Sequence, residues 1–459
     1  MSFYLSCRAA EPPSIPISLI TTLMGSARTN FTHDPYIFYP NSYPPKALKE
    51  WMELANTGNQ RGYTHGRPRF SILLPFYLIQ LLWITSWMAS VSSPVMPLYI
   101  RSLGIGEKGW GIIAMFQAVG MVATEWFWGA LSDRGHRMRY ASFSLIIMSI
   151  LYPLYTFHSL FRYLLVIQVL FGAFSIIMGP ISRAIVTNHS PHESIGFSMA
   201  IWSVTMTIGT MIGNIVGSYI ADVFGFEKSF YLSSILSLLG FFATYVTSRA
   251  MPETAENREF ELSIFEGLKN GLGVLISNPS LRGLLFIAVS SFAAYSVLMT
   301  FLPLYASDMI GMSIIEIGIL RSVMSLTSLI TTVFFGKISD SINKRHLVAV
   351  GFLCATIFFI SYPFLKAKIL VYIVSIGVSI FMSVYPLVVA MVADLTPKNL
   401  LGLSMGVFGS FEDTGFMIGP AIYGLVWTIY QPGYVFLTSA IFTIICFIMI
   451  LNEFFPTRQ

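Results

Sequence analysis

The chain has 459 residues, of which 55% are hydrophobic and only 11% charged, with a formal net charge of +5 at pH 7. Because a soluble domain carries about 25% charged residues, this composition excludes a water-soluble globular protein and predicts a polytopic membrane protein. The net positive charge does not indicate nucleic-acid binding, since the basic residues lie in loops between apolar stretches. Two of the three cysteines lie inside apolar stretches, which argues against a disulfide framework.

Residues 1–69 are Pro-rich and polar, and we expect them to form a mostly disordered cytoplasmic tail. The apolar run from residue 17 to residue 24 is too short to cross a bilayer. The prolines and Glu11 before that run argue against a cleaved signal peptide. The alternative is that the protein starts internally, for instance at Met52.

Twelve apolar stretches follow, each near the roughly 20 residues that a helix needs to cross a bilayer. Basic residues are concentrated in alternate loops, which predicts that both termini are cytoplasmic. We therefore expect an all-α polytopic membrane protein with an N-terminal half at 70–249 and a C-terminal half at 281–459. A cytoplasmic linker, 250–280, is expected to contain an amphipathic helix. The twelve stretches are 71–99, 109–131, 140–158, 163–187, 194–221, 229–249, 281–305, 313–338, 346–366, 369–394, 401–430 and 432–454.

The second half of the chain repeats features of the first. Pro191 and Gly196 recur 206 residues later as Pro397 and Gly402, and the tripeptide Pro97-Leu98-Tyr99 recurs at the same offset. A near-constant offset across half the chain indicates two six-helix, pseudo-symmetric halves related by an axis along the membrane normal. In such an arrangement the transport site lies at the interface between the halves.

A cationic loop, 129–139, joins the second and third stretches, and a related loop, 336–345, follows the eighth. These loops, the helix count and the repeat together resemble the major facilitator superfamily (MFS) of secondary transporters over about residues 71–454. In that family the acid of the loop pairs with basic residues and latches one conformation. The alternative is that the charges only determine topology. The resemblance assigns gating to Gly129, Asp133 with Arg134 and Arg137, and to Gly336 and Asp340 with Lys344.

Small residues spaced for close helix packing occupy the fifth and eleventh stretches, at Gly209, Gly213 and Gly217 and at Gly415, Gly419 and Pro420. The first set resembles the small-residue motif of family exporters, although Asn214 stands where a proline is expected. Ordinary helix packing is the alternative explanation. Family exporters also carry an arginine in the fourth span, where this chain has Gln168. If that arginine takes part in proton coupling, this chain performs its step differently or lacks it.

Glu412 and Asp413 lie about 16 Å into the eleventh stretch, near the middle of a roughly 30 Å hydrocarbon core. A charge at that depth is costly unless it faces a cavity or a partner, so a functional role is the default interpretation. Both are predicted to couple transport to protons, with Asp413 facing the cavity and Glu412 sharing the stripe of Gly415 and Gly419. The alternative is a structural ion pair or a neutral, hydrogen-bonded acid.

The resemblance also implies a central cavity lined by polar and aromatic residues. An aromatic cavity with few fixed charges suits an amphipathic or weakly cationic solute. Ordinary helix packing is again the alternative for any one of these side chains. The residues predicted to line the cavity are Gln80, Trp83, Trp87, Gln168, Tyr295, Arg321 and Tyr385.

The sequence thus predicts a secondary active transporter, not an enzyme, that works by alternating access in the plasma membrane. Proton-coupled export of an amphipathic or drug-like compound is the leading hypothesis. The alternatives are an importer or uniporter of a sugar or small organic acid, and a non-transporting membrane sensor. The expected partners are a small-molecule solute, protons and membrane lipid, without nucleic acid, and the protein is expected to be monomeric. No nucleotide-binding or metal-binding motif is found, so no cofactor or metal is expected.

Overall fold

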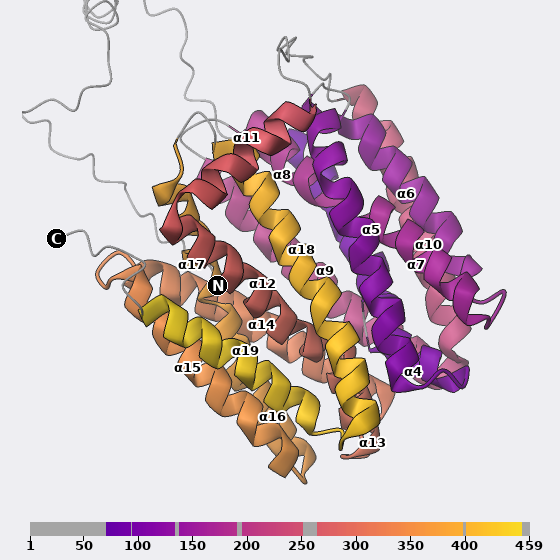
Figure 1. Cartoon of the computed structure of the whole chain (residues 1–459). Coiled ribbons are helices and arrows are strands. Elements are labelled where there is room, and N and C mark those ends of the chain that lie inside the picture. Colours follow the sequence, from indigo (N-terminus) through magenta and orange to yellow (C-terminus); the bar gives the residue numbers. More distant parts are fainter. Residues whose placement is uncertain are drawn as a thin grey trace, which may run out of the picture. The chain divides into compact units, whose positions relative to one another are not determined.

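The computed structural model describes residues 70–92, 94–133, 137–190, 195–250, 264–397 and 401–451. The chain divides into two compact units, Met1–Gly66 and Arg67–Gln459, and all of the described residues belong to the second. Across those residues the regular structure is helical (Figure 1). The predicted N-terminal tail lies outside the described residues.

The helices follow the predicted stretches in order. The first half contains α3 (Phe70–Ala89), α4 (Val95–Ser102), α5 (Glu107–Asp133), α6 (Arg137–Leu154), α7 (Phe161–Ser175), α8 (Met178–His189), α9 (Ile195–Phe224) and α10 (Phe226–Ala250). A linking helix, α11 (Ile264–Ser277), packs on α18, α12 and α5. The second half contains α12 (Pro279–Thr300), α13 (Leu302–Asp308), α14 (Ile314–Ile338), α15 (Lys344–Ser361), the short 3₁₀ helix η2 (Tyr362–Phe364), α16 (Lys368–Met382), α17 (Tyr385–Leu395), α18 (Leu401–Ile429) and α19 (Tyr434–Leu451).

Four predicted stretches are each built from two consecutive α-helices rather than one, and each of the four second helices has a proline at or near its start. Pro94 precedes α4, Pro303 lies in the first turn of α13 and Pro386 in the first turn of α17. Proline lacks an N–H group and disfavours helical backbone in the residue before it, so a helix readily restarts there. At the break between α7 and α8, after Ser175, Pro180 is the third residue of α8.

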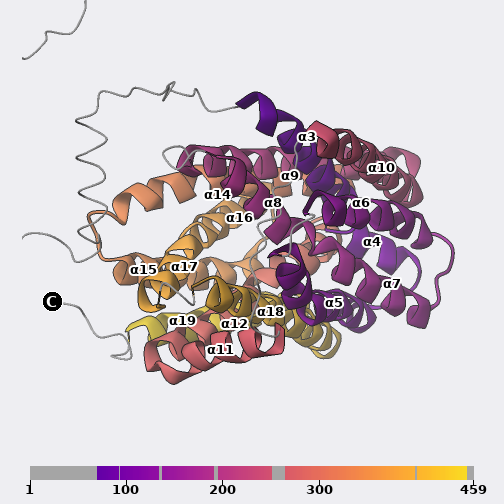
Figure 2. The same ribbon diagram turned by 90° about the horizontal axis from the view of Figure 1, so that it is seen from above.

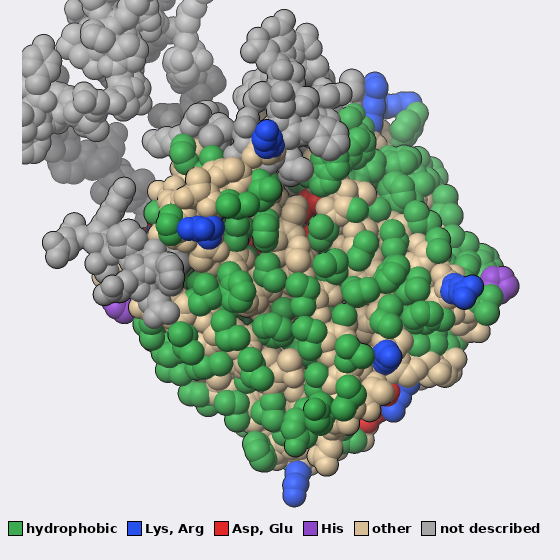
Figure 3. All heavy atoms as spheres, in the orientation of Figure 1, with side chains coloured by type: hydrophobic (Ala, Val, Ile, Leu, Met, Phe, Trp, Pro, Cys, Tyr) green, Lys and Arg blue, Asp and Glu red, His purple; other side chains and the backbone are tan. Residues whose placement is uncertain are grey.

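Nine helical stretches of the described residues are long and apolar enough to cross a membrane, and Leu73–Ala89 is a shorter apolar helix. Their outer faces carry large apolar side chains, as on α10, where Ile235, Leu239, Phe242 and Val246 are exposed. Figure 3 shows one face of the molecule on which hydrophobic side chains dominate and few charged ones lie among them. Such a surface suits lipid rather than water, so the chain is an all-helical, multi-pass membrane protein.

The two halves meet along two helix pairs, α5 with α18 and α9 with α14 (Figures 1 and 2). Both contacts depend on glycine. The Cα of Gly111 on α5 faces the backbone of Pro420 and Gly424 on α18. A Cβ at Gly318 on α14 would lie 2.6 Å from the carbonyl oxygen of Asn214 on α9. Without side chains at these positions the helix backbones approach closely.

Candidate functional site

A cavity of about 360 Å³ lies where helices of the two halves meet. Helices α3 and α9 of the first half and α12, α14 and α16 of the second contribute its lining. Four methionines and Leu329 supply apolar surface, while seven serines and threonines supply hydroxyl groups. Tyr295 and Arg321 complete the lining, and Arg321 is its one charged residue within the described part of the chain. A cavity of this size and mixed polarity can hold a small amphipathic molecule.

Arg321 is held in the cavity wall by contacts to α12. Its side chain is buried, with a residue exposure of 5%, and Nη1 donates a hydrogen bond to the Leu298 carbonyl oxygen at 3.0 Å. Its Nη2 contacts the Met299 sulfur. Among the described residues Arg321 forms no ion pair. The guanidinium is therefore buried, and no carboxylate of the described residues is paired with it.

Of the seven residues predicted at the cavity, the structure places Tyr295 and Arg321 there. Gln80 and Gln168 are instead fully buried between helices of the first half. Gln80 donates to the Trp202 carbonyl oxygen at 3.1 Å, and Gln168 donates to Gln117 Oε1 at 3.0 Å. The physical reason for the difference is that amides can satisfy their hydrogen bonds on a neighbouring helix, which helical spacing alone does not reveal.

The remaining predicted cavity residues are aromatic and also lie outside the cavity lining. Trp83 and Trp87 contact each other on α3, with ring centroids 5.7 Å apart. Tyr385 packs edge-on against Phe292 of α12 and donates its hydroxyl to Glu412 Oε1 at 2.5 Å. Tyr385 thus belongs to a second polar site, away from Arg321.

That second site is an acid cluster formed by Glu125 of α5 and by Glu412 and Asp413 of α18. Asp413 is 8% exposed, and its Oδ2 has no hydrogen-bond partner in the described structure. The Glu125 carboxylate lies against Gly409 of α18, one turn before Asp413. Glu125 Oε2 accepts a hydrogen bond from Ser410 at 3.5 Å across the α5–α18 contact. The acid cluster therefore joins the two halves, and none of its members lines the 360 Å³ cavity described above.

Glu125 was not among the predicted coupling residues. The sequence does contain one indication of a functional role for Glu125, because its charge lies inside an apolar stretch, one turn before Gly129. Sequence alone could not place it beside Asp413, because the two residues are on different halves.

The structure places one of the predicted gating residues in an ion pair with a residue that the prediction did not name. Lys344 begins α15 and forms an ion pair with Asp394 of α17, with 2.8 Å between Nζ and Oδ2. Asp340, the predicted partner, is exposed and forms no ion pair in the described part of the chain. The reason is that Lys344 lies in the first turn of α15 beside α17, whereas Asp340 precedes that turn. The side chain of Asp133 and all of Arg134 lie outside the described structure.

The opposite end of the bundle carries a charged contact that the sequence analysis missed. Arg101 at the end of α4 forms an ion pair with Asp308 at the end of α13 and lies 3.8 Å from Glu107. Nearby, Trp110 Nε1 donates to the Thr300 carbonyl oxygen at 2.8 Å. The Arg101–Asp308 ion pair and the Trp110–Thr300 hydrogen bond each link the first half to the second. By the predicted topology this α4–α13 end faces outward.

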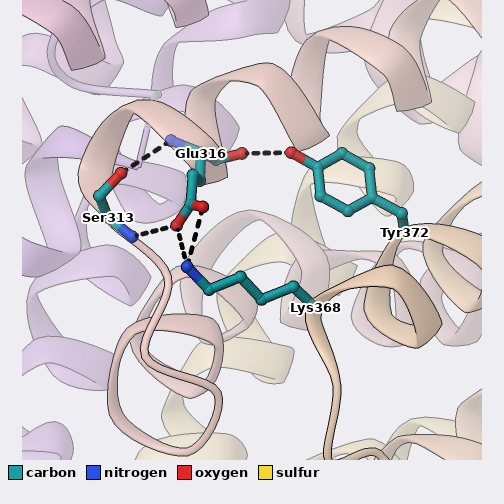
Figure 4. A network of polar contacts seen from close by, with 4 residues as sticks. All are labelled: Ser313, Glu316, Lys368 and Tyr372. Atoms are coloured by element: carbon teal, nitrogen blue, oxygen red, sulfur yellow. Dashed lines mark hydrogen bonds and ion pairs between the residues drawn. The ribbon is translucent and has the colours of Figure 1, made fainter.

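At the same end, α14 and α16 are tied together within the second half (Figure 4). Ser313 and Glu316 form a capping box at the start of α14. Lys368 Nζ lies 2.7 Å from Glu316 Oε2, and the Tyr372 hydroxyl donates to the Glu316 carbonyl oxygen at 2.9 Å. These contacts link the start of α14 to the start of α16.

The glycines predicted at small-residue positions pack within each half. Gly209, Gly213 and Gly217 of α9 face α3, and Gly415 and Gly419 of α18 face α12. Pro420 lies at the contact between α18 and α5, where its carbonyl oxygen faces Gly111. Three predicted gating residues lie at helix ends. Gly129 lies near the end of α5, Arg137 begins α6, and Gly336 lies in the last turn of α14.

Comparison with known proteins identifies the family. The family model described as the Major Facilitator Superfamily matches residues 78–389 and 316–458. An uncharacterized MFS-type transporter of Methanocaldococcus jannaschii is 21% identical over 372 residues, which cover 80% of this chain and 95% of the relative. The Multi-drug resistance efflux pump PmrA homolog of Lactococcus lactis is 23% identical, covering 72% of this chain and 83% of its own. The Multidrug resistance protein MdtG of Proteus mirabilis is 26% identical, covering 56% and 65%.

Solved structures share the fold. A point mutant of the nucleoside transporter NupG superposes with a TM-score of 0.70 at 12% identity, covering 83% of this chain and all of NupG. A bacterial homolog of the human lysosomal transporter Spinster, in an inward-facing and unoccupied conformation, has a TM-score of 0.66 at 16% identity and covers 84% and 97%.

Proposed function

Because the chain belongs to the Major Facilitator Superfamily, and to its drug and solute exporter branch, we propose that it exports an amphipathic organic solute by proton-coupled alternating access. It is a membrane transporter, not an enzyme. The proposal includes twelve membrane crossings in two halves, a monomer in the plasma membrane and both termini in the cytoplasm.

The observation that carries the proposal is the position of the cavity. Residues from both halves line it, and the Arg101–Asp308 ion pair joins the halves at the α4–α13 end. Rocking one half against the other would open that end and alter access to the cavity, as alternating access requires. Glycine contacts between α5 and α18 and between α9 and α14 offer smooth surfaces for such a movement.

The acid cluster supports proton coupling. A group that carries protons must bind one on one side of the membrane and release it on the other, and intramembrane carboxylates serve this purpose in pumps and transporters. Here the acids of the cluster lie on the moving contact between α5 and α18. Movement of the halves would therefore change how close Glu125 lies to Glu412 and Asp413.

We propose export as the direction of transport because relatives have names that denote multidrug resistance and efflux, and because α9 carries the small-residue positions.

Proton coupling is tested by imposing a pH gradient across vesicles that contain the purified protein. Parent protein should accumulate a member of a panel of fluorescent amphipathic dyes, and Asp413→Asn should abolish accumulation but retain dye exchange without a gradient. Exchange survives because it needs only the rocking of the halves.

The matched control is Glu227→Gln, which removes an exposed acid at the start of α10 and should behave like the parent. Proton coupling through α18 is rejected if Asp413→Asn and Glu412→Gln both accumulate dye like the parent. Export of this class of solute is rejected if the parent moves none of the dyes.

A further inference from the structure

We propose that the Arg321 guanidinium binds an anionic oxygen group, a carboxylate or a phosphate, on the solute that occupies the cavity. The remainder of the solute would be apolar. This inference rests on the proposed transport function and deepens it by giving the solute a charge.

The first step of the argument is the unmatched charge of Arg321. Burying a guanidinium is costly unless it is paired or hydrogen-bonded, and a lone buried charge is retained mainly for function. A guanidinium has five N–H donors in a planar fork that matches carboxylate and phosphate oxygens. The contacts to Leu298 and Met299 occupy only part of that fork, and the described residues supply no carboxylate to it.

The second step is the supply of further donors in the same cavity. The hydroxyls of Thr210, Ser328 and Thr332 line the cavity and have no side-chain hydrogen bond among the described residues. Ser203, Thr207, Ser325 and Ser379 also line it, but each donates to a carbonyl oxygen of its own helix. Ser328 and Thr332 lie seven and eleven residues beyond Arg321 on α14, so their hydroxyls can bind polar groups elsewhere on the solute, while the guanidinium binds the anionic group.

The third step is the apolar part of the lining. Met88, Met206, Met299, Met324 and Leu329 come from four helices around the cavity. Methionine is unbranched and polarizable, so it adapts to apolar groups of different shape. The cavity therefore suits a molecule with one anionic group and an apolar body, rather than a sugar that is polar on all sides.

The fourth step is the separation of Arg321 from the acids. No acidic residue lines the cavity in the described part of the chain, and the acid cluster lies on the α5–α18 contact. A cationic solute would meet the charge of Arg321 without an acid to offset it. The weakly cationic solute suggested by the aromatic residues is therefore disfavoured, and anion binding can be measured apart from proton coupling.

The test uses four fluorescent probes that share one apolar body. Naphthalene carrying a carboxylate, a phosphate, an ammonium-methyl or a hydroxyl group is titrated into the purified full chain in lipid nanodiscs. We expect the carboxylate or the phosphate probe to bind at least tenfold more tightly than the ammonium probe. Whichever of the two binds more tightly identifies the anionic group.

Three variants assign the effect to Arg321. Arg321→Gln should weaken binding of the preferred anion at least tenfold and leave the naphthol probe within twofold of the parent, while Arg321→Lys should be intermediate. The control Arg162→Gln removes an exposed guanidinium at the start of α7 and should leave all four probes within twofold. Unfolding temperatures of all variants are measured alongside.

Several results would overturn the inference. They are a parent that binds neither anion, anions that bind no more tightly than the ammonium probe, and an Arg321→Gln variant that loses all probes equally. Failure of the proposed transport function would give a different result from failure of the Arg321 inference. The parent would then bind the anion in an Arg321-dependent manner yet fail to carry it across vesicles.

Discussion

Arg101 and Asp308 lie 207 residues apart in the chain, yet they form an ion pair that joins the two halves at the α4–α13 end. Both residues are at the C-terminal ends of short helices that follow proline breaks, α4 and α13. The pair is partly exposed, with 41% of the Arg101 side chain accessible, so it contributes at most about 1 kcal/mol. Such a contact can bias two conformations of a bundle without locking either of them.

The first prediction follows from this pair. Asp308→Asn should raise the population open at the α4–α13 end by up to about fivefold, because loss of an exposed pair costs no more than about 1 kcal/mol. Spin labels at positions 103 and 309 should report longer distances. The double exchange Arg101→Asp with Asp308→Arg should restore the short distance. Lys108→Gln, an exposed neighbour, serves as the control, and unchanged distances in Asp308→Asn would remove the pair from the gating argument.

The second prediction concerns the residue that only the structure connects with the acids. Glu125→Gln should lower dye accumulation driven by a pH gradient at least tenfold and leave exchange largely intact, as for Asp413→Asn. The reason is that its carboxylate lies across the moving contact from α18. Accumulation equal to that of the parent would limit the coupling site to α18.

The third prediction concerns topology. In a protein lacking its native cysteines, Ile342→Cys should resist an impermeant thiol reagent added outside intact cells, whereas Glu227→Cys should react. Both positions are exposed in the structure, so the protein itself shields neither. Labelling at position 342 from outside would invert the predicted orientation and place the Arg101–Asp308 pair at the cytoplasmic end.

The fourth prediction concerns helix packing on α9. Gly217→Ala should destabilise the protein by about 1–3 kcal/mol, because the added Cβ would lie 2.5 Å from Ala89 Cα. Gly196→Ala in the first turn of α9 meets no atom within 4 Å and should be neutral or mildly stabilising. Thermal unfolding in detergent distinguishes the two, and equal unfolding temperatures would contradict close packing at Gly217.

Some features of the protein could be determined from the sequence because they depend on local composition. The apolar stretches predicted helices at the places where the structure has them, and the loop motifs with the internal repeat led to the family. The glycines of α9 and α18 could be assigned to packing because spacing along a helix defines a shared face. The depth of Glu412 and Asp413 likewise followed from counting residues into a stretch.

Other features depended on which helices become neighbours, and only the tertiary structure decided them. Helical spacing grouped Gln80 with the cavity residues, but the fold turns its amide toward Trp202. The same fold places Arg321 in a cavity that no acidic residue of the described part of the chain lines, and it places Glu125 against Gly409 and Ser410 of α18. Hydrogen bonds and charges act over a few ångströms in space, whereas the sequence orders residues only along the chain, so contacts between separate helices cannot be read from either helix alone.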